Sequence, residues 1–306
     1  MQKKQNFRWG IKQLLEDIKK PVITDAELFQ LVLSLLESRH THGHDINIRS
    51  SSITQEAITR RIYDLSGPVI KIDPDFKKDE YSPTAASPNR VWKNPSSDKG
   101  SAEEVACSVD PFCYISHLSA MQIYGLTNRN SKDLMITTSG RLAWKRLIAP
   151  IVEQLKDNHE LWLSPVHITL PSQLRGRTLN VFSTENIYYP SVTQDNEISR
   201  VVPVGRCFLD MLSEPELCGG LSHVIDTYKE HAHVFIKEII SAGEEDTRPI
   251  LKVRLGCILD EYLGIKDDRI EKWVSFAQRG GSRKMDSKKP FDGSHISKKW
   301  MLSLNE

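Results

Sequence analysis

Residues 52–65 read SITQEAITRRIYDL, and the architecture of the N-terminal part of the chain depends on how they fold. The apolar residues recur at helical spacing and fall on one side: Ile53, Ala57, Ile58, Ile62 and Leu65. Ser52 and Gln55 fit the capping box S-x-x-Q, so we predict that a helix begins at Ser52. Gly67-Pro68 ends it.

The segments on either side of this helix extend the pattern. Two amphipathic helices precede it, and Thr24 with Glu27 forms a capping box at the start of the second. Two short β-like runs follow it, VIKI at 69–72 and VWK at 91–93, joined by a Lys- and Pro-rich loop. This order of three helices, strand, basic loop and strand is that of a winged helix-turn-helix. We predict such a domain over residues 1–97.

The predicted third helix and wing carry side chains suited to double-stranded DNA. A recognition helix presents polar groups opposite its core stripe, and basic side chains contact phosphates. The predicted contacts are Ser52, Thr54, Gln55, Thr59, Arg60 and Arg61 on the helix and Lys71, Lys77, Lys78 and Arg90 on the wing. Thr54, Gln55, Thr59 and Arg60 are expected to read bases, and Arg61 and the wing lysines to contact phosphates. The alternative is a helical bundle with ordinary exposed polar residues.

The rest of the chain divides by composition. Residues 94–101, NPSSDKGS, are typical of a linker or flexible joint. Residues 98–200 mix strand and helix patterns, which predicts a mixed α/β domain, and residues 201–277 predict a helical subdomain. Residues 278–306 are basic and rich in Gly and Ser, so we expect a flexible tail. The predicted fold class is α+β.

Charge is distributed unevenly, although Lys plus Arg (41) nearly balances Asp plus Glu (40) over the 306 residues. Residues 1–97 carry 15 basic against 12 acidic side chains, and residues 279–306 carry 7 against 3. The middle is acidic, so a polyanion would be attracted to both ends. Imbalances of this size are also ordinary for a solvated surface.

Composition also bounds the location of the protein. No run approaches the roughly 18 apolar residues of a membrane helix, and the start, MQKKQNFRWGIKQ, lacks the apolar region of a secretory signal. The five cysteines include no CxxC pair. We therefore expect a cytoplasmic protein with reduced, mostly buried thiols and no membrane partner.

No local motif of a common enzyme class is present. The sequence lacks a phosphate-binding loop, a dinucleotide-binding glycine motif, a zinc-protease helix and a nucleophile elbow. His40, His42 and His44 alternate as metal ligands would, but a solvated loop is the simpler interpretation, and we assign no metal or cofactor. Ser116 and Ser119 flank His117, where we expect the hydroxyls to cap a helix rather than to act as nucleophiles.

Three later segments resemble the antitoxin domain of AbiEi-type proteins. They are FCYISHLSAMQIYGLTNR (112–129), FLDMLSEPELCGGLSHVIDTY (208–228) and ILKVRLGCILDEYLG (250–264). They occur in the family's order behind a predicted winged helix, and the Pro-Glu-Leu-x-Gly-Gly match is the most specific. The longer N-terminal region, the His-rich loop and the basic tail depart from the family's pattern.

The resemblance implies the antitoxin of a type IV toxin–antitoxin system of abortive infection, which is a phage defence. Such a protein represses its own operon through the winged helix and counteracts a nucleotidyltransferase toxin without forming a stable complex with it. A homo-oligomer is left open, and no catalytic activity is expected. Two alternatives remain: a nucleotide-handling or nuclease-like enzyme with His117 in the middle domain, and a protein-docking module formed by the helices of residues 200–273.

Overall fold

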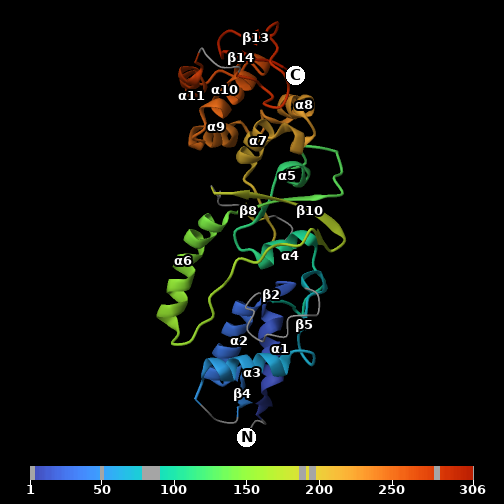
Figure 1. Ribbon diagram of the computed structural model, residues 1–306, viewed down its shortest axis with the longest axis vertical. Helices are drawn as coiled ribbons and strands as arrows, with labels where there is room; N and C mark the ends of the chain where they lie inside the picture. The colour runs from blue at the N-terminus through green and yellow to red at the C-terminus, as the bar shows by residue number, and fades with distance from the viewer. Residues whose placement is uncertain are drawn as a thin grey trace. The chain divides into compact units, whose positions relative to one another are not determined.

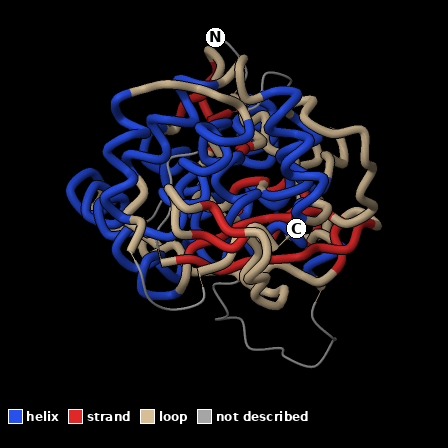
Figure 2. The backbone as a smooth tube through the Cα atoms, turned by 90° about the horizontal axis from the view of Figure 1, so that it is seen from above, coloured by secondary structure: helices blue, strands red, loops and turns tan. Residues whose placement is uncertain are grey.

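The structure is a computed structural model that describes residues 4–48, 52–77, 90–185, 191–192, 198–278 and 283–305, with only the backbone of 191–192. These residues form both helices and short strands (Figures 1 and 2), so the protein is of the mixed α+β class. No helix in the described ranges combines the length and apolar character that a bilayer crossing requires.

The chain divides into two units that interleave in sequence. The first comprises the described residues within Met1–Tyr114, Ile136–Ile187 and Val192–Arg200. The second comprises those within Ile115–Met135, Tyr188–Ser191 and Val201–Glu306.

The first unit begins with three helices and two small sheets. Its elements are β1 (Gln5–Asn6), α1 (Phe7–Asp17), β2 (Val22–Thr24), α2 (Asp25–Ser38), β3 (His40–Thr41), β4 (His44–Asn47), α3 (Gln55–Leu65), β5 (Lys71–Ile72), the 3₁₀ turn η1 (Pro74–Phe76) and β6 (Val91–Lys93). One sheet has the order β2-β6-β5, all antiparallel, and the other has the order β1-β4-β3. A shared core buries side chains of all three helices and of β6, including Leu28, Phe29, Ile58, Ile62 and Trp92.

Helix starts in this unit follow from local capping. The predicted capping box of α2 is confirmed, because Thr24 donates its backbone N–H to Glu27 at 2.7 Å and its hydroxyl accepts from the Glu27 backbone. The predicted start of α3 at Ser52 is wrong. The cap is Thr54, whose backbone is extended and whose hydroxyl accepts from the N–H of Ala57 at 3.2 Å.

The predicted flexible joint at residues 94–101 begins with a residue that is anchored in the fold. Asn94 is fully buried, and its amide nitrogen donates to the backbone carbonyls of Leu15, Ile18 and Lys20, each at 3.0 Å. The last carbonyls of a helix need donors when they are buried, and here a side chain from the supposed joint supplies them.

The remaining elements of the first unit include α4 (Ala102–Val109), α6 (Arg141–Asn158), β9 (Gln173–Leu174) and β10 (Arg177–Thr184). A sheet of six strands has the order β11-β12-β7-β8-β10-β9. Its other strands are β7 (Tyr114–Ile115), β8 (Leu134–Ser139), β11 (Ser191–Val192) and β12 (Arg200–Val201).

The second unit is mainly helical. Its elements are α5 (His117–Ile123), α7 (Val204–Ser213), η2 (Pro215–Cys218), α8 (Leu221–His231), α9 (Ile236–Glu245), α10 (Pro249–Cys257), η3 (Ile258–Tyr262), α11 (Asp268–Trp273), η4 (Val274–Phe276), β13 (Ile296–Ser297) and β14 (Leu302–Ser303). Arg206 of α7 is buried and pairs with Asp246, at the end of α9, and with Asp210, one turn along α7. The pair with Asp246 joins α7 to the end of α9, whereas the pair with Asp210 lies within α7.

The described part of the predicted flexible tail, residues 283–305, is folded instead. Met285, Trp300 and Leu302 are fully buried. The indole N–H of Trp300 donates to Asp260 at 3.2 Å, and the Asn305 amide donates to the Asp286 carbonyl at 2.9 Å. A few large apolar residues among many polar ones are enough to anchor this segment.

Candidate nucleic-acid interface

Helix α3 has one buried and one exposed side, as its sequence predicts. Ile58, Ile62 and Leu65 are buried in the core of the first unit. The opposite side is open, and Tyr63 is 76% exposed on it. Gln55, Glu56, Thr59 and Arg60 are exposed too. The polar side of α3 is therefore available to a ligand rather than buried in the unit's core.

The predicted base-reading residues differ in how far their polar groups are already engaged. Thr54 uses its hydroxyl as the cap of α3. Thr59 donates its hydroxyl to the Gln55 carbonyl at 2.9 Å, which leaves its oxygen as an acceptor. Ser52 is exposed but lies before the helix. Of the predicted base-reading residues, Gln55 and Arg60 therefore have the side-chain donors that are least engaged within the protein.

The wing residues also separate into two kinds. Lys71 and Lys77 are exposed, and Lys78 lies outside the described residues. Arg90, by contrast, donates to the carboxylate of Asp25 at 3.3 Å, and its guanidinium lies 5.1 Å from the Trp92 ring centre. Asp25 is 3% exposed, so this contact fixes β6 against the start of α2 and gives Arg90 a structural role.

The strand register reveals a cation that the sequence did not single out. Lys71 on β5 pairs directly with Lys93 on β6. Both lie at the end of the strands remote from the loop that joins them, since Ile72 pairs with Trp92 on the loop side. Like charges placed directly opposite each other destabilise a sheet. An anion bound there would relieve this repulsion.

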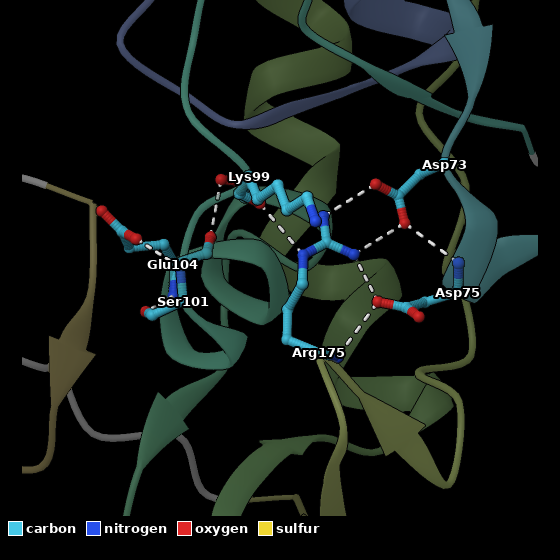
Figure 3. Close-up of polar contacts among 7 residues, drawn as sticks. Asp73, Asp75, Lys99, Ser101, Glu104 and Arg175 are labelled. Atoms are coloured by element: carbon cyan, nitrogen blue, oxygen red, sulfur yellow. Dashed lines mark hydrogen bonds and ion pairs between the residues drawn. The ribbon is translucent and has the colours of Figure 1, made fainter.

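A partly buried ion-pair cluster holds Asp73 and Asp75, which follow β5 (Figure 3). Arg175, in the turn between β9 and β10, contacts both carboxylate oxygens of Asp73 at 3.0 and 2.7 Å and also pairs with Asp75. Its Nε donates to the Lys99 carbonyl at 3.0 Å. The hydrogen bonds that Arg175 donates to Asp73 are the main cause of its raised pKa. The cluster fixes the chain immediately before Lys77.

One acidic residue on the exposed side of α3 opposes an anion. Glu56 lies in the first helical turn, where a backbone hydrogen bond and the Thr54 hydroxyl lower its pKa. Its carboxylate is therefore ionised at neutral pH, and it stabilises the positive end of the helix dipole. The same charge would repel a phosphate approaching Arg60.

The histidines of the His-rich loop lie in a hairpin. His40 pairs with Asp45 at 3.3 Å, His42 pairs with Asp17 at 3.2 Å, and His44 contacts the Trp9 ring edge-on. The three imidazoles thus have separate partners. Within the described residues, no group of His, Cys, Asp or Glu has a metal-binding arrangement.

The residues of the rival catalytic hypothesis are close together but buried. His117 is 7% exposed, and its Nδ1 lies 2.8 Å from the Ser116 hydroxyl. Burial lowers the pKa of His117 to about 4, so it is neutral at physiological pH. The predicted capping role of the hydroxyls is wrong, because Ser116 makes no side-chain cap and Ser119 accepts from the N–H of Met135 at 3.0 Å.

All five cysteines have free thiols and are buried, as their sequence context predicts. Cys107 and Cys113 have their sulfur atoms 3.9 Å apart. Arg200 donates to the backbone carbonyls of both residues, at 2.9 and 3.0 Å.

Comparisons with known proteins give little further information. No family model matches the chain, and no curated protein matches it. Among solved structures, the chain is similar to the RV2827C protein from Mycobacterium tuberculosis, with a TM-score of 0.45 and 9% sequence identity. The likeness covers 98% of this chain and 92% of that one.

Proposed function

We propose that this protein is a DNA-binding transcriptional autorepressor and the antitoxin of a type IV toxin–antitoxin system. Its first 97 residues form a winged helix-turn-helix in this proposal, with α3 as the recognition helix. The protein has no catalytic activity of its own, binds its own operator and counteracts a nucleotidyltransferase toxin without a stable complex.

The observation that supports the DNA-binding part of the proposal is the exposed polar side of α3, in a unit that also contains the antiparallel sheet β2-β6-β5. Helices α1, α2 and α3 and the strand order β2-β6-β5 match the connectivity of a winged helix, with β5 and β6 flanking the wing. One feature is unusual for this motif, because the β3–β4 hairpin occupies the connection between α2 and α3. Gln55 and Arg60 are of the residue types that read adenine and guanine.

The antitoxin part rests on the three sequence segments that resemble AbiEi-type proteins. Two of them include buried helices of the second unit: α7 with η2, and α10. In the first of these, Gly219 and Gly220 both have φ of +90°, which a side chain would strain. The Gly-Gly pair of the most specific match is thus suited to the backbone found there.

The DNA-binding part is tested by fluorescence anisotropy with DNA from immediately upstream of the gene. Arg60→Ala is expected to lower the affinity by about 1–3 kcal/mol and to relax sequence preference. Glu56→Gln should strengthen binding, because it removes a negative charge from the same side of α3. Arg141→Ala, which removes an exposed arginine on α6, is the control. Unchanged binding by Arg60→Ala would remove α3 as the recognition helix.

The antitoxin part needs a separate experiment. The first step is to look for a nucleotidyltransferase-like reading frame directly downstream of the gene. Co-expression of this protein with the product of that reading frame should restore growth that the toxin alone arrests. The purified protein should not turn over nucleotides. Metal-dependent turnover that His117→Asn abolishes would instead establish the enzyme hypothesis.

A further inference from the structure

A hollow adjoins α3 beside the proposed recognition surface. Its volume is about 630 Å³, and it lies where the start of α1, the end of β4 and the second half of α3 meet. Its lining residues are Asn6, Phe7, Arg8, Asn47, Arg61, Asp64 and Leu65. Small-molecule sites typically have volumes of about 300–1,000 Å³, so the hollow is large enough for a ligand such as a nucleotide.

Two guanidinium groups give the hollow its positive charge. Arg8 is exposed and makes only a long hydrogen bond, 3.5 Å, to the backbone carbonyl of Asp64. The guanidinium of Arg61 lies 5.2 Å from the ring centre of Phe7, which holds it by a cation–π contact. Within the described residues, no carboxylate forms an ion pair with either group. Both can therefore bind an anion without breaking an existing pair.

The backbone and amides around the hollow add further donors. The side-chain oxygen of Asn6 accepts from the N–H of Trp9 at 2.9 Å, so the amide NH₂ is the part that remains for a ligand. Asn47 is the strand partner of Asn6, which places a second amide beside it. The first turn of α1 contains no acidic residue, so no carboxylate there neutralises the positive end of its dipole. Such a set favours a ligand rich in acceptors and negatively charged.

We propose that this hollow binds the phosphate group of a nucleotide, with Arg8 and Arg61 as its cations and Asn6 as a further donor. Arginine forks match phosphate geometry. Asp64 is the one carboxylate among the lining residues, and its negative charge opposes the phosphate. The phosphate is that of a free mononucleotide or of the DNA backbone, and the second source rests on the proposed function.

The free-nucleotide arm uses isothermal titration calorimetry of the full chain with AMP and with inorganic phosphate. Arg8→Gln and Arg61→Gln are each expected to weaken binding by about tenfold, the effect of losing a hydrogen bond to a charged group. Asp64→Asn should strengthen it. Arg141→Gln, a matched change at an exposed arginine of α6, should leave it unchanged.

The DNA arm measures the salt dependence of binding to upstream and scrambled duplexes. If the hollow holds a backbone phosphate, Arg8→Gln and Arg61→Gln weaken both duplexes equally. Each variant also lowers the slope of log affinity against log salt by about one. Arg60→Ala, in contrast, should change the ratio between the two duplexes.

The outcomes separate this inference from the proposed function. A loss in either arm supports the hollow and identifies the source of the phosphate. Undetectable binding of AMP and phosphate, together with an unchanged salt slope, overturns it. The wild-type protein could bind upstream and scrambled DNA equally well while Arg61→Gln still weakens AMP binding. That result would support the phosphate site in the hollow and contradict the proposed function. Should Arg61→Gln fail to fold, the strengthened binding by Asp64→Asn remains a test, and its absence counts against the inference.

Discussion

Single buried polar side chains join distant parts of the sequence in this protein. Asp25 accepts from the indole N–H of Trp92 at 2.6 Å and from the backbone N–H of Arg90 at 3.1 Å. Asn94 closes the end of α1. Each buried polar group needs its partners, because an unpaired one costs about 1–3 kcal/mol. Replacing one partner of such a contact affects both of the segments that it joins.

His117 predicts a specific pH dependence of stability. The pKa of His117 is about 4 in the folded protein, and its ordinary value, expected in the unfolded chain, is 6.5. Between these two pH values the unfolded chain therefore binds a proton at His117 and the folded chain does not. The free energy of unfolding therefore falls as the pH drops from 6.5 towards 4, by about 3 kcal/mol from this residue. In urea titrations, the free energy of unfolding of the His117→Asn variant should not show this fall between pH 6.5 and pH 4. Asn tolerates the positive φ of 50° at this position.

The control for this experiment is His233→Asn, because His233 is exposed. That variant should retain the wild-type difference in stability between pH 7 and pH 4.5. If His117→Asn also retained it, burial of a neutral imidazole would not be the cause of the acid sensitivity.

At the scale of elements, local rules predict some boundaries and leave others undetermined. Thr24 and Glu27 predict the start of α2 because both halves of the capping box lie within four residues. At α3 two hydroxyl residues compete, Ser52 and Thr54, and the second caps the helix. The local sequence does not decide between them, because Ser and Thr are both favourable cap residues. The exposed polar side of α3 was predictable from its sequence, whereas the structural role of Arg90 depends on Asp25, 65 residues earlier.

The ion-pair cluster of Arg175 with Asp73 and Asp75, a clamp on the chain after β5, predicts that replacing Arg175 lowers stability strongly. Asp73 is 1% exposed at its side chain, so Arg175→Ala would leave a buried carboxylate without its main partner. We expect the free energy of unfolding to fall by about 3 kcal/mol in urea titrations. Ala keeps the positive φ of 52°, so the comparison reports the side chain rather than relief of backbone strain.

Two further variants test this explanation. Adding Asp73→Asn to Arg175→Ala should recover part of the loss, because the buried charge is gone. Lys77→Ala, at an exposed side chain just after the clamp, should change stability by less than about 0.5 kcal/mol. An equal effect of Lys77→Ala and Arg175→Ala would argue against a clamp.

At the scale of the whole molecule, composition predicts the fold class correctly, but it does not show which loop-like segments are anchored in the fold. The α+β class follows from alternating helix and strand patterns, and the structure confirms it. The supposed joint at residues 94–101 and the supposed tail at 283–305 both contain polar and small residues that are common in loops. Each nevertheless contains residues that are fully buried, Asn94 in the first and Trp300 in the second. Average composition cannot reveal such anchors, because one side chain determines the outcome.

Trp300 provides the sharpest test of whether the C-terminal segment belongs to the folded second unit. Its ring packs so closely on Gly256 that a Cβ at that position would clash with it, and its indole N–H donates to Asp260. Truncating a fully buried aromatic side chain costs about 3–5 kcal/mol, so Trp300→Ala should lower the stability of this unit by that amount in thermal and urea unfolding. Phe291→Ala, at a ring that is 48% exposed, should have little effect. If the C-terminal segment were a flexible tail, neither substitution would change the stability. If it is folded, the stability of α10 depends on a residue more than 40 positions beyond the end of that helix.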